Sequence, residues 1–196
     1  MLAGERIAVL DTETTGMSPS AGAELVEVAV VDVEDGRLGA TWSSLVRPSR
    51  AIPPGATAVH GITDAMVAGA PPPAEVAARL RRAVGDRPVV FHNAPFDLPF
   101  VVAMLRAGGQ PPILAPVVDT LGLARGLFGT GSNSLGQLAG RLGLPRETSH
   151  RALGDALTTA RLLLALAERW QAEKGVRSLA ELAAASQDVM RVTARR

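Results

Sequence analysis

The chain has 196 residues, of which 47% are hydrophobic and 20% charged, a composition typical of a folded globular protein rather than a disordered one. This length predicts one sizeable core and no second full domain. A formal net charge of +1 excludes attraction of a polyanion through bulk charge, and the lack of cysteine excludes disulfides and thiolate metal sites. There is no signal-peptide pattern and no apolar run near the roughly 20 residues that span a membrane, so we expect no membrane partner and a cytoplasmic location.

The first part of the chain predicts three strands followed by an irregular segment. An apolar, β-branched run at residues 6–10 predicts a buried strand, and the run at 24–33 predicts a second. Asp35-Gly36 is a hairpin signal that leads into a third strand at about 38–46. We therefore expect an antiparallel meander, and then an irregular crossing through 47–73, which is rich in Pro, Gly and Ala.

The rest of the chain predicts helices that alternate with short strands, with proline near helix starts and glycine after helix ends. The predicted elements are a helix at 73–84, a strand at 88–91, a helix at 95–106, a strand at 117–118, and helices at 120–127, 134–142 and 152–173. This order predicts an α/β fold with a mixed sheet, antiparallel first and parallel later, flanked by helices. We expect a domain at 1–173 and a C-terminal tail at 174–196, an appendage that is weakly helical or disordered, with disorder favoured for 191–196.

Two carboxylates stand two residues apart at the end of the first predicted strand. Asp11 and Glu13 follow an apolar run, and alternate residues of a strand point to the same side, so both side chains should share a face. Crowded carboxylates repel one another and are costly to bury, a conflict that a bridging divalent cation resolves. The alternative is a solvated acidic turn, and this motif by itself leaves both interpretations open.

Two more acidic motifs lie where predicted strands end or helices begin. Asp97 falls in the first turn of a helix that follows a strand, where open α/β sheets collect ligands. His150 and Asp155 flank the start of the long helix, and their separation of five residues does not align them on one helical face, so His150 should reach the site from the preceding loop. Each aspartate alone could simply favour a helix N-terminus. Their joint occurrence, in an order compatible with one sheet, predicts a shared acidic site.

Together these motifs closely resemble those of the DEDDh group of 3′–5′ exonucleases, which includes the proofreading epsilon-type subunit of bacterial DNA polymerase III. The resemblance covers residues 6–169. The matching strings are Asp11-Thr-Glu-Thr-Thr-Gly16, Val59-His-Gly-Ile-Thr63, His92-Asn-Ala-Pro-Phe-Asp97, Val118-Asp-Thr-Leu121, Ser134-Leu135 and His150-Arg-Ala-Leu-Gly-Asp155-Ala. A sibling group has tyrosine in place of the histidine of the last motif, and this sequence contains no tyrosine. The resemblance implies a ribonuclease-H-like fold, in agreement with the predicted element order.

The resemblance also implies hydrolysis of phosphodiester bonds with two divalent cations. Ligands that are all oxygen suit Mg²⁺ or Mn²⁺, and two such ions roughly 3.5–4 Å apart stabilise the attacking and the leaving oxygen. By resemblance, Asp11 bridges both ions and Asp97 holds the second, partly through water. Glu13 and Asp155 complete the site beside the nucleophile. His150 would be the general base on the attacking water, a role that fits its usual pKa of about 6.5.

The same resemblance places five further residues at the terminal nucleotide of the 3′ end: Thr14, Thr15, His60, Asn93 and Phe96. Phe96 could stack on a base or pack within its own helix, and both remain open. His60 could border the site or hold its loop through a hydrogen bond. Since only 3% of the residues are aromatic, we expect contacts to few nucleotides and little sequence preference.

The expected substrate is the 3′ end of single-stranded DNA. RNA or short oligonucleotides are the alternative, because the same catalytic residues serve both polymers and only a contact to the 2′-hydroxyl separates them. A different alternative is a proofreading accessory protein that docks on a DNA polymerase subunit through residues 174–196. A metal-dependent phosphatase is a further, more distant alternative.

Overall fold

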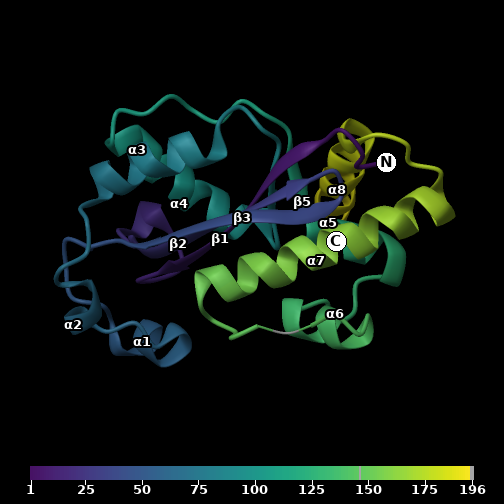
Figure 1. The fold of residues 1–196 in the computed structure, drawn as a ribbon. Helices are drawn as coiled ribbons and strands as arrows, with labels where there is room; N and C mark the ends of the chain where they lie inside the picture. The colour runs from purple at the N-terminus through teal and green to yellow at the C-terminus, as the bar shows by residue number, and fades with distance from the viewer. Residues whose placement is uncertain (146, 195–196) are drawn as a thin grey trace.

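A computed structural model describes residues 1–145 and 147–194 of the chain. Its centre is a five-stranded sheet in the order β3-β2-β1-β4-β5, with helices on both faces (Figure 1). The strands are β1 (Arg6–Thr14), β2 (Leu25–Glu34), β3 (Arg37–Leu45), β4 (Val89–Phe91) and β5 (Val117–Asp119). The first three are antiparallel neighbours, whereas β4 is parallel to β1 and β5 to β4. The predicted mixed sheet is confirmed.

The helices connect and cover these strands. They are η1 (Pro19–Ala21), α1 (Pro54–His60), α2 (Asp64–Val67), α3 (Pro73–Val84), α4 (Ala94–Ala107), α5 (Thr120–Phe128), α6 (Leu135–Arg141), α7 (Ala152–Lys174) and α8 (Leu179–Ala194). From α3 to α7 they match the predicted helices closely. None of the helices in the described part of the chain combines the length and the apolar character that a membrane crossing requires.

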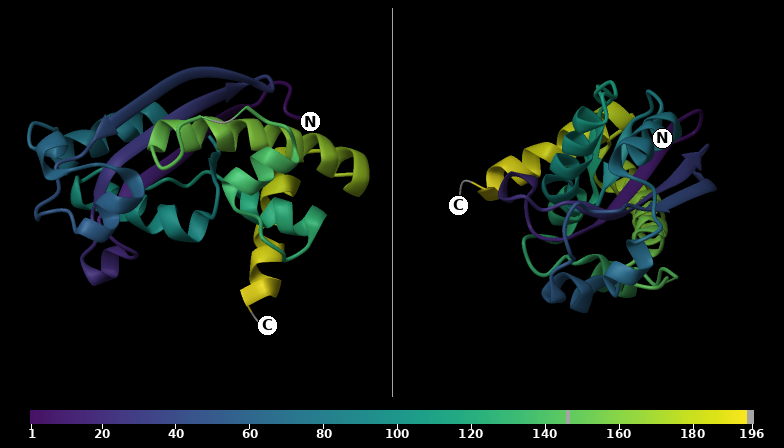
Figure 2. Two further views of the ribbon diagram at one scale, coloured as in Figure 1. Left: turned by 90° about the horizontal axis from the view of Figure 1, so that it is seen from below. Right: turned by 90° about the vertical axis from the view of Figure 1, so that its left-hand side faces the viewer.

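The period-two pattern of β1 divides the hydrophobic core between the two faces of the sheet. Ile7 and Val9 contact the cluster under α5, α7 and α8, whereas Ala8 and Leu10 contact the cluster under α3 and α4. The helices on these two faces lie on opposite sides of the sheet in Figures 1 and 2. The ends of β1, β4 and β5 are thereby held at one edge of the molecule, where α4, α5 and α7 begin.

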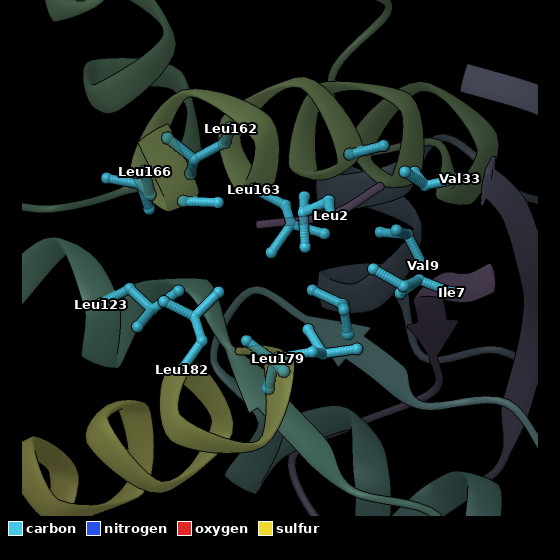
Figure 3. Close-up of a cluster of buried hydrophobic side chains, with 14 of the residues drawn as sticks. Leu2, Ile7, Val9, Val33, Leu123, Leu162, Leu163, Leu166, Leu179 and Leu182 are labelled. Atoms are coloured by element: carbon cyan, nitrogen blue, oxygen red, sulfur yellow. The ribbon is translucent and has the colours of Figure 1, made fainter. Parts of the chain in front are cut away.

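The segment after Lys174 differs from the expected appendage. It forms α8, which packs on α5 and β5, and Leu179, Leu182 and Ala183 are buried in the larger core cluster (Figure 3). The apolar face of this helix supplies the contact that the weak sequence pattern did not predict. Disorder was expected for 191–196, but α8 continues to Ala194, and 195–196 lie outside the described residues. The domain division at residue 173 stays a prediction.

Two more local differences lie near the site. β1 does not end at Leu10 but runs to Thr14, because β2 pairs with it along this whole length. The crossing at 47–73 is not wholly irregular, since it contains α1 and α2. Its Pro, Gly and Ala content predicted an irregular segment, whereas Pro54 occupies the first turn of α1, where proline needs no hydrogen-bonded N–H.

Candidate active site

The last residues of β1 present two carboxylates at the edge of the sheet. Asp11 and Glu13 are both half-buried. They lie opposite Ala29 and Glu27 of β2, and the pairing register shifts just after Glu13. Such an irregularity ends regular pairing and is common beside functional sites. The two side chains were predicted to share one face of the strand, and the close approach of their carboxylate oxygens is consistent with this placement.

Asp155 joins these two carboxylates from the first turn of α7. One carboxylate oxygen each of Asp11, Glu13 and Asp155 lies within 4.8 Å of the other two. The N-terminus of a helix favours negative charge, which lowers the cost of placing a third acidic group here. Folding therefore unites the first and last acidic motifs of the sequence.

Asp97 docks against the same end of β1 from α4. Its Oδ1 accepts hydrogen bonds from the backbone N–H of Thr12, at 3.1 Å, and from the Thr12 hydroxyl, at 2.6 Å. Thr12 lies between Asp11 and Glu13, so the Asp97 side chain is fixed beside the other carboxylates, although it lies outside their tight group of three. The structure thus brings together the four acidic residues predicted for the site.

Burial raises the pKa values of all four carboxyl groups, and repulsion between carboxylates adds to this effect at Asp11 and Glu13. Burial, and then the charges of Asp97 and Asp155, raise the pKa of Asp11 well above its usual range. Burial and then Asp155 raise the pKa of Glu13 to about 8. Burial raises the pKa of Asp97 to about 6, although the Thr12 hydrogen bonds act in the opposite direction. Burial also raises the pKa of Asp155, against the lowering effect of the His150 backbone N–H.

A hard divalent cation fits this cluster. Mg²⁺ and Mn²⁺ prefer carboxylate oxygens, and a cation would relieve the repulsion that contributes to the raised pKa values of Asp11 and Glu13. Asp11, Glu13 and Asp155 could each supply one oxygen, with Asp97 adjacent. Among the described residues, this is the one group of three or more His, Asp or Glu side chains with metal-binding spacing.

His150 lies directly before α7, in the preceding loop, as the residue spacing predicted. Its backbone has a φ of 59°, in the left-handed region that non-glycine residues rarely adopt. The His150 backbone N–H donates to Asp155 Oδ2 at 2.8 Å, and its side chain is exposed. A Cβ on Gly154 would overlap the carbonyl oxygen of Thr148, so the loop approaches the first turn of α7 closely because Gly154 has no side chain.

The two threonines after the carboxylates use their hydroxyl groups within the loop. The Thr14 hydroxyl donates to the Gly16 carbonyl at 2.7 Å, and the Thr15 hydroxyl accepts from the backbone N–H of Glu24 at 2.9 Å. These bonds fix the chain as it leaves β1. Contact of either threonine with a 3′ end stays a prediction.

Asn93 and Phe96 lie at the start of α4. Asn93 is exposed, has a φ of 74°, and donates its backbone N–H to Asp119 Oδ1 at 3.0 Å. The half-buried ring of Phe96 packs against Phe100, with ring centroids 5.6 Å apart. Packing within the helix is therefore one fate of Phe96, and stacking on a base through its exposed part stays a prediction.

His60 is buried at the end of α1 and holds the following turn. Its Nδ1 accepts a hydrogen bond from the backbone N–H of Ile62 at 3.0 Å, and this bond holds the loop, which is one of the two roles expected for His60. Burial lowers the pKa of His60, and this effect is partly offset by the backbone of Thr14 and the charge of Glu27. Its ring therefore lies close to the carboxylate site, while a contact with substrate remains a prediction.

The sequence interpretation missed Glu27, a buried carboxylate of β2 that lies opposite Glu13 and accepts hydrogen bonds from Arg151 and Ala152. It was visible as a charged residue within an apolar strand. It also missed Asp119, at the end of β5, whose side chain accepts the backbone N–H groups of Asn93 and Ala94 and so holds the start of α4.

Comparison with known proteins places this arrangement in a family. The model of the RNase_T family, described as exonuclease, matches residues 8–163. The DNA polymerase III subunit epsilon-like protein of Rhodobacter capsulatus is 45% identical over 163 residues, which cover 81% of this chain but only 23% of that protein. The DNA polymerase III subunit epsilon of Pasteurella multocida is 36% identical over 163 residues, which cover 79% of this chain and 64% of that one.

The structural comparison agrees. The solved structure of Exonuclease X in complex with 5′ overhanging duplex DNA is 32% identical and has a TM-score of 0.73, covering 92% of this chain and 99% of that one. Its likeness confirms the mixed sheet flanked by helices, and the matched family confirms the resemblance read from the acidic motifs. The matched residues include all four site carboxylates and His150. This chain belongs to the exonuclease family.

Proposed function

We propose that the chain is a metal-dependent 3′–5′ exonuclease that hydrolyses phosphodiester bonds from the 3′ end of single-stranded DNA. The observation that carries the proposal is the cluster of Asp11, Glu13 and Asp155, whose oxygens lie within 4.8 Å of one another beside the buried Asp97. Membership of the exonuclease family and the complex of Exonuclease X with DNA support it. A cytoplasmic location belongs to the same proposal, because the relatives are named as a DNA polymerase III subunit epsilon and an epsilon-like protein.

In this proposal the four carboxylates hold two Mg²⁺ or Mn²⁺ ions. Asp11 would contribute to holding both ions, Glu13 and Asp155 would help to hold the ion beside the nucleophile, and Asp97 would help to hold the other. When bound, such ions neutralise charge that develops on the scissile phosphate and make the attacking water more acidic. The raised pKa values of the carboxyl groups support cation binding, because repulsion among them is what a cation relieves.

His150 acts in this proposal as the general base that takes a proton from the attacking water. Its exposed ring can approach a substrate, while the bond from its backbone N–H to Asp155 ties its position to the cluster. A histidine works near neutral pH because its usual pKa is about 6.5. In this proposal the ring accepts a proton and is not a metal ligand.

The terminal nucleotide would lie against the surface formed by the loop after β1 and the start of α4. We assign Thr14, Thr15, His60, Asn93 and Phe96 to this contact. The first three lie close to one another, since the Thr14 backbone acts on the pKa of His60 through a hydrogen bond and Thr15 follows Thr14 in the chain. Asn93 is exposed just after β4, the strand adjacent to β1.

A proofreading role with a DNA polymerase subunit is the second candidate, favoured by the names of the relatives from Rhodobacter and Pasteurella. It predicts that the chain co-purifies with a polymerase catalytic subunit from its own organism. If the chain purifies alone and cleaves DNA at full rate, the free-standing enzyme is the better description.

The test is incubation of the pure chain with Mg²⁺ or Mn²⁺ and matched single-stranded DNA and RNA labelled at the 5′ end. We expect a ladder of products that shortens from the 3′ end, faster on DNA, and that a chelator abolishes. Asp155→Asn should show no ladder. Cleavage of small phosphate esters without cleavage of either polymer would replace this proposal with a phosphatase, and faster cleavage of RNA would reassign the substrate.

A further inference from the structure

The start of α7 is attached to the sheet through Glu27 of β2. Only 5% of Glu27 is exposed. Its Oε1 accepts from Arg151 Nη2 at 2.7 Å, and its Oε2 accepts from Arg151 Nε at 3.1 Å and from the Ala152 backbone N–H at 2.9 Å. Two bonds from one guanidinium to both oxygens fix direction as well as distance.

Glu27 also replaces the cap that α7 does not provide for itself. The N-cap residue Arg151 makes no capping bond with its own side chain. The first N–H groups of a helix have no partner within the helix, and a carboxylate there gains from the helix dipole. Glu27 therefore caps α7 from a strand that lies 125 residues earlier in the chain.

The loop that carries His150 is otherwise held by contacts to α7. The His150 backbone N–H bonds to Asp155, Glu147 pairs with Arg161 at 2.8 Å, and the Thr148 carbonyl lies against Gly154. These contacts fix the loop to α7, and the buried residues of α7 pack the helix on β1 and β2. The bonds to Glu27 connect this unit to β2, next to the carboxylates of β1.

Glu27 lies beside the carboxylate cluster, but its two oxygens are used differently. It is the register partner of Glu13, and its charge contributes to the raised pKa values of Glu13 and Asp11. Both its oxygens, however, already accept hydrogen bonds from Arg151 or Ala152. This use of the oxygens separates it from the groups that could hold a cation.

We propose that Glu27 is a positioning residue whose clamp, its bonds with Arg151 and Ala152, fixes the start of α7 against the carboxylates of β1. His150 and Asp155 are the groups whose placement depends on this clamp. Its effect on catalysis rests on the proposed function, whereas its effect on the His150 loop does not.

Two substitutions test the clamp in the full chain. Glu27→Gln keeps the size and one acceptor but removes the charge, and Arg151→Lys keeps every charge but cannot bond both oxygens. Matched controls are Asp32→Asn and Arg87→Lys, which change a partly buried ion pair, 2.9 Å long, that joins the same strand β2 to the segment before β4. For each variant the measurements are kcat and KM on single-stranded DNA, Mn²⁺ binding by calorimetry, and hydrogen exchange of the His150 and Val31 amides by NMR.

We expect both clamp variants to lower kcat at least about tenfold with KM little changed, because a shift of roughly 1 Å in a catalytic group costs up to about 10²-fold. The His150 amide should exchange at least about tenfold faster, whereas Val31, in the middle of β2, keeps its rate. Both controls should match the wild type in kcat and in His150 exchange.

Three results would overturn the clamp. The first is unchanged His150 exchange and kcat in Glu27→Gln. The second is a loss of kcat in Glu27→Gln that Arg151→Lys does not share, which would make the effect one of charge. The third is loss of Mn²⁺ binding in Glu27→Gln with normal His150 exchange, which would make Glu27 a ligand. If the wild type cleaves no DNA, the proposed function fails, and the His150 exchange still decides the clamp.

Discussion

The folded chain does little to offset the cost of burying the Asp11 and Glu13 carboxyl groups near other carboxylates. Each is partly buried and faces other carboxylates, so burial and repulsion raise both pKa values. A site of this kind lowers the stability of the metal-free protein and gives a divalent cation something to neutralise. Residues that hold the cation and residues that move a proton should therefore respond differently to substitution.

His150→Ala and Asp11→Ala test that difference. His150→Ala should lower kcat by about 10²-fold or more, the usual contribution of a general base, while Mn²⁺ binding by calorimetry stays near that of the wild type. Asp11→Ala should lose both, because it removes a carboxylate of the cluster whose oxygen lies within 4.8 Å of those of Glu13 and Asp155. Near wild-type turnover in His150→Ala would remove the base assignment.

Gly154→Ala tests how closely the His150 loop must approach α7. Alanine within a helix usually stabilises a protein relative to glycine by about 0.5–1 kcal/mol. At Gly154 its methyl group would overlap the Thr148 carbonyl, so we expect a loss of about 1–3 kcal/mol in urea unfolding and a lower kcat. Gly136→Ala, in α6 with no neighbouring atom within 4 Å, is the control and should be neutral or stabilising. Equal stability changes at the two sites would show that the loop adjusts freely.

At the scale of whole elements, strands and long helices were predictable because their apolar periodicity is local. The run before Asp11 and the helix around Asp155 could both be placed from neighbouring residues alone. The bond between Glu27 and Arg151 could not, since the partners lie 124 residues apart and no local pattern pairs one with the other. The packing of α8 was missed for the same reason, because the surface that covers it belongs to α5 and β5.

Ser186→Ala tests whether α8 stabilises the edge of the sheet. The buried Ser186 hydroxyl accepts the backbone N–H of Asp119 at 3.1 Å, at the end of edge strand β5. Its removal leaves a buried N–H unpaired, so we expect a loss of about 1–3 kcal/mol in urea unfolding. Ser43→Ala, at an exposed position of β3, should change stability by less than about 0.5 kcal/mol. A loss no larger than that of Ser43→Ala would mean that this hydrogen bond does not stabilise the edge.

At the scale of the whole molecule, the site joins one end of β1 to α4 and α7, which lie on opposite faces of the sheet (Figure 2). A cation held there would connect both halves of the core. Its binding free energy would therefore appear as stability of the entire fold, since a ligand that binds only the native state raises the free energy of unfolding.

The pH dependence of unfolding tests this connection, best between pH 7 and 8.5. His92, whose pKa burial lowers to about 4, is neutral in the folded protein there, and histidines of the unfolded chain are mostly neutral too. Glu13, with a pKa of about 8, keeps a proton in the folded protein over part of this range, whereas the unfolded chain has released it, and burial raises the pKa of Asp11 in the same direction. The stabilisation from a raised pKa is lost as pH rises through the folded value, by at most about 1.4 kcal/mol per pH unit and group.

Without metal, the melting temperature should therefore fall from pH 7 to 8.5. Glu13→Gln should make this fall shallower, because it removes one of the titrating groups. Saturating Mg²⁺ should raise the melting temperature most at the upper end of the range, because cation binding requires the deprotonated carboxylates. Differential scanning calorimetry in chelator and in Mg²⁺ measures both. A metal-free melting temperature that rises over this range would show that the carboxyl groups are already ionised in the folded protein, and the electrostatic reason for a cation at this site would then be lost.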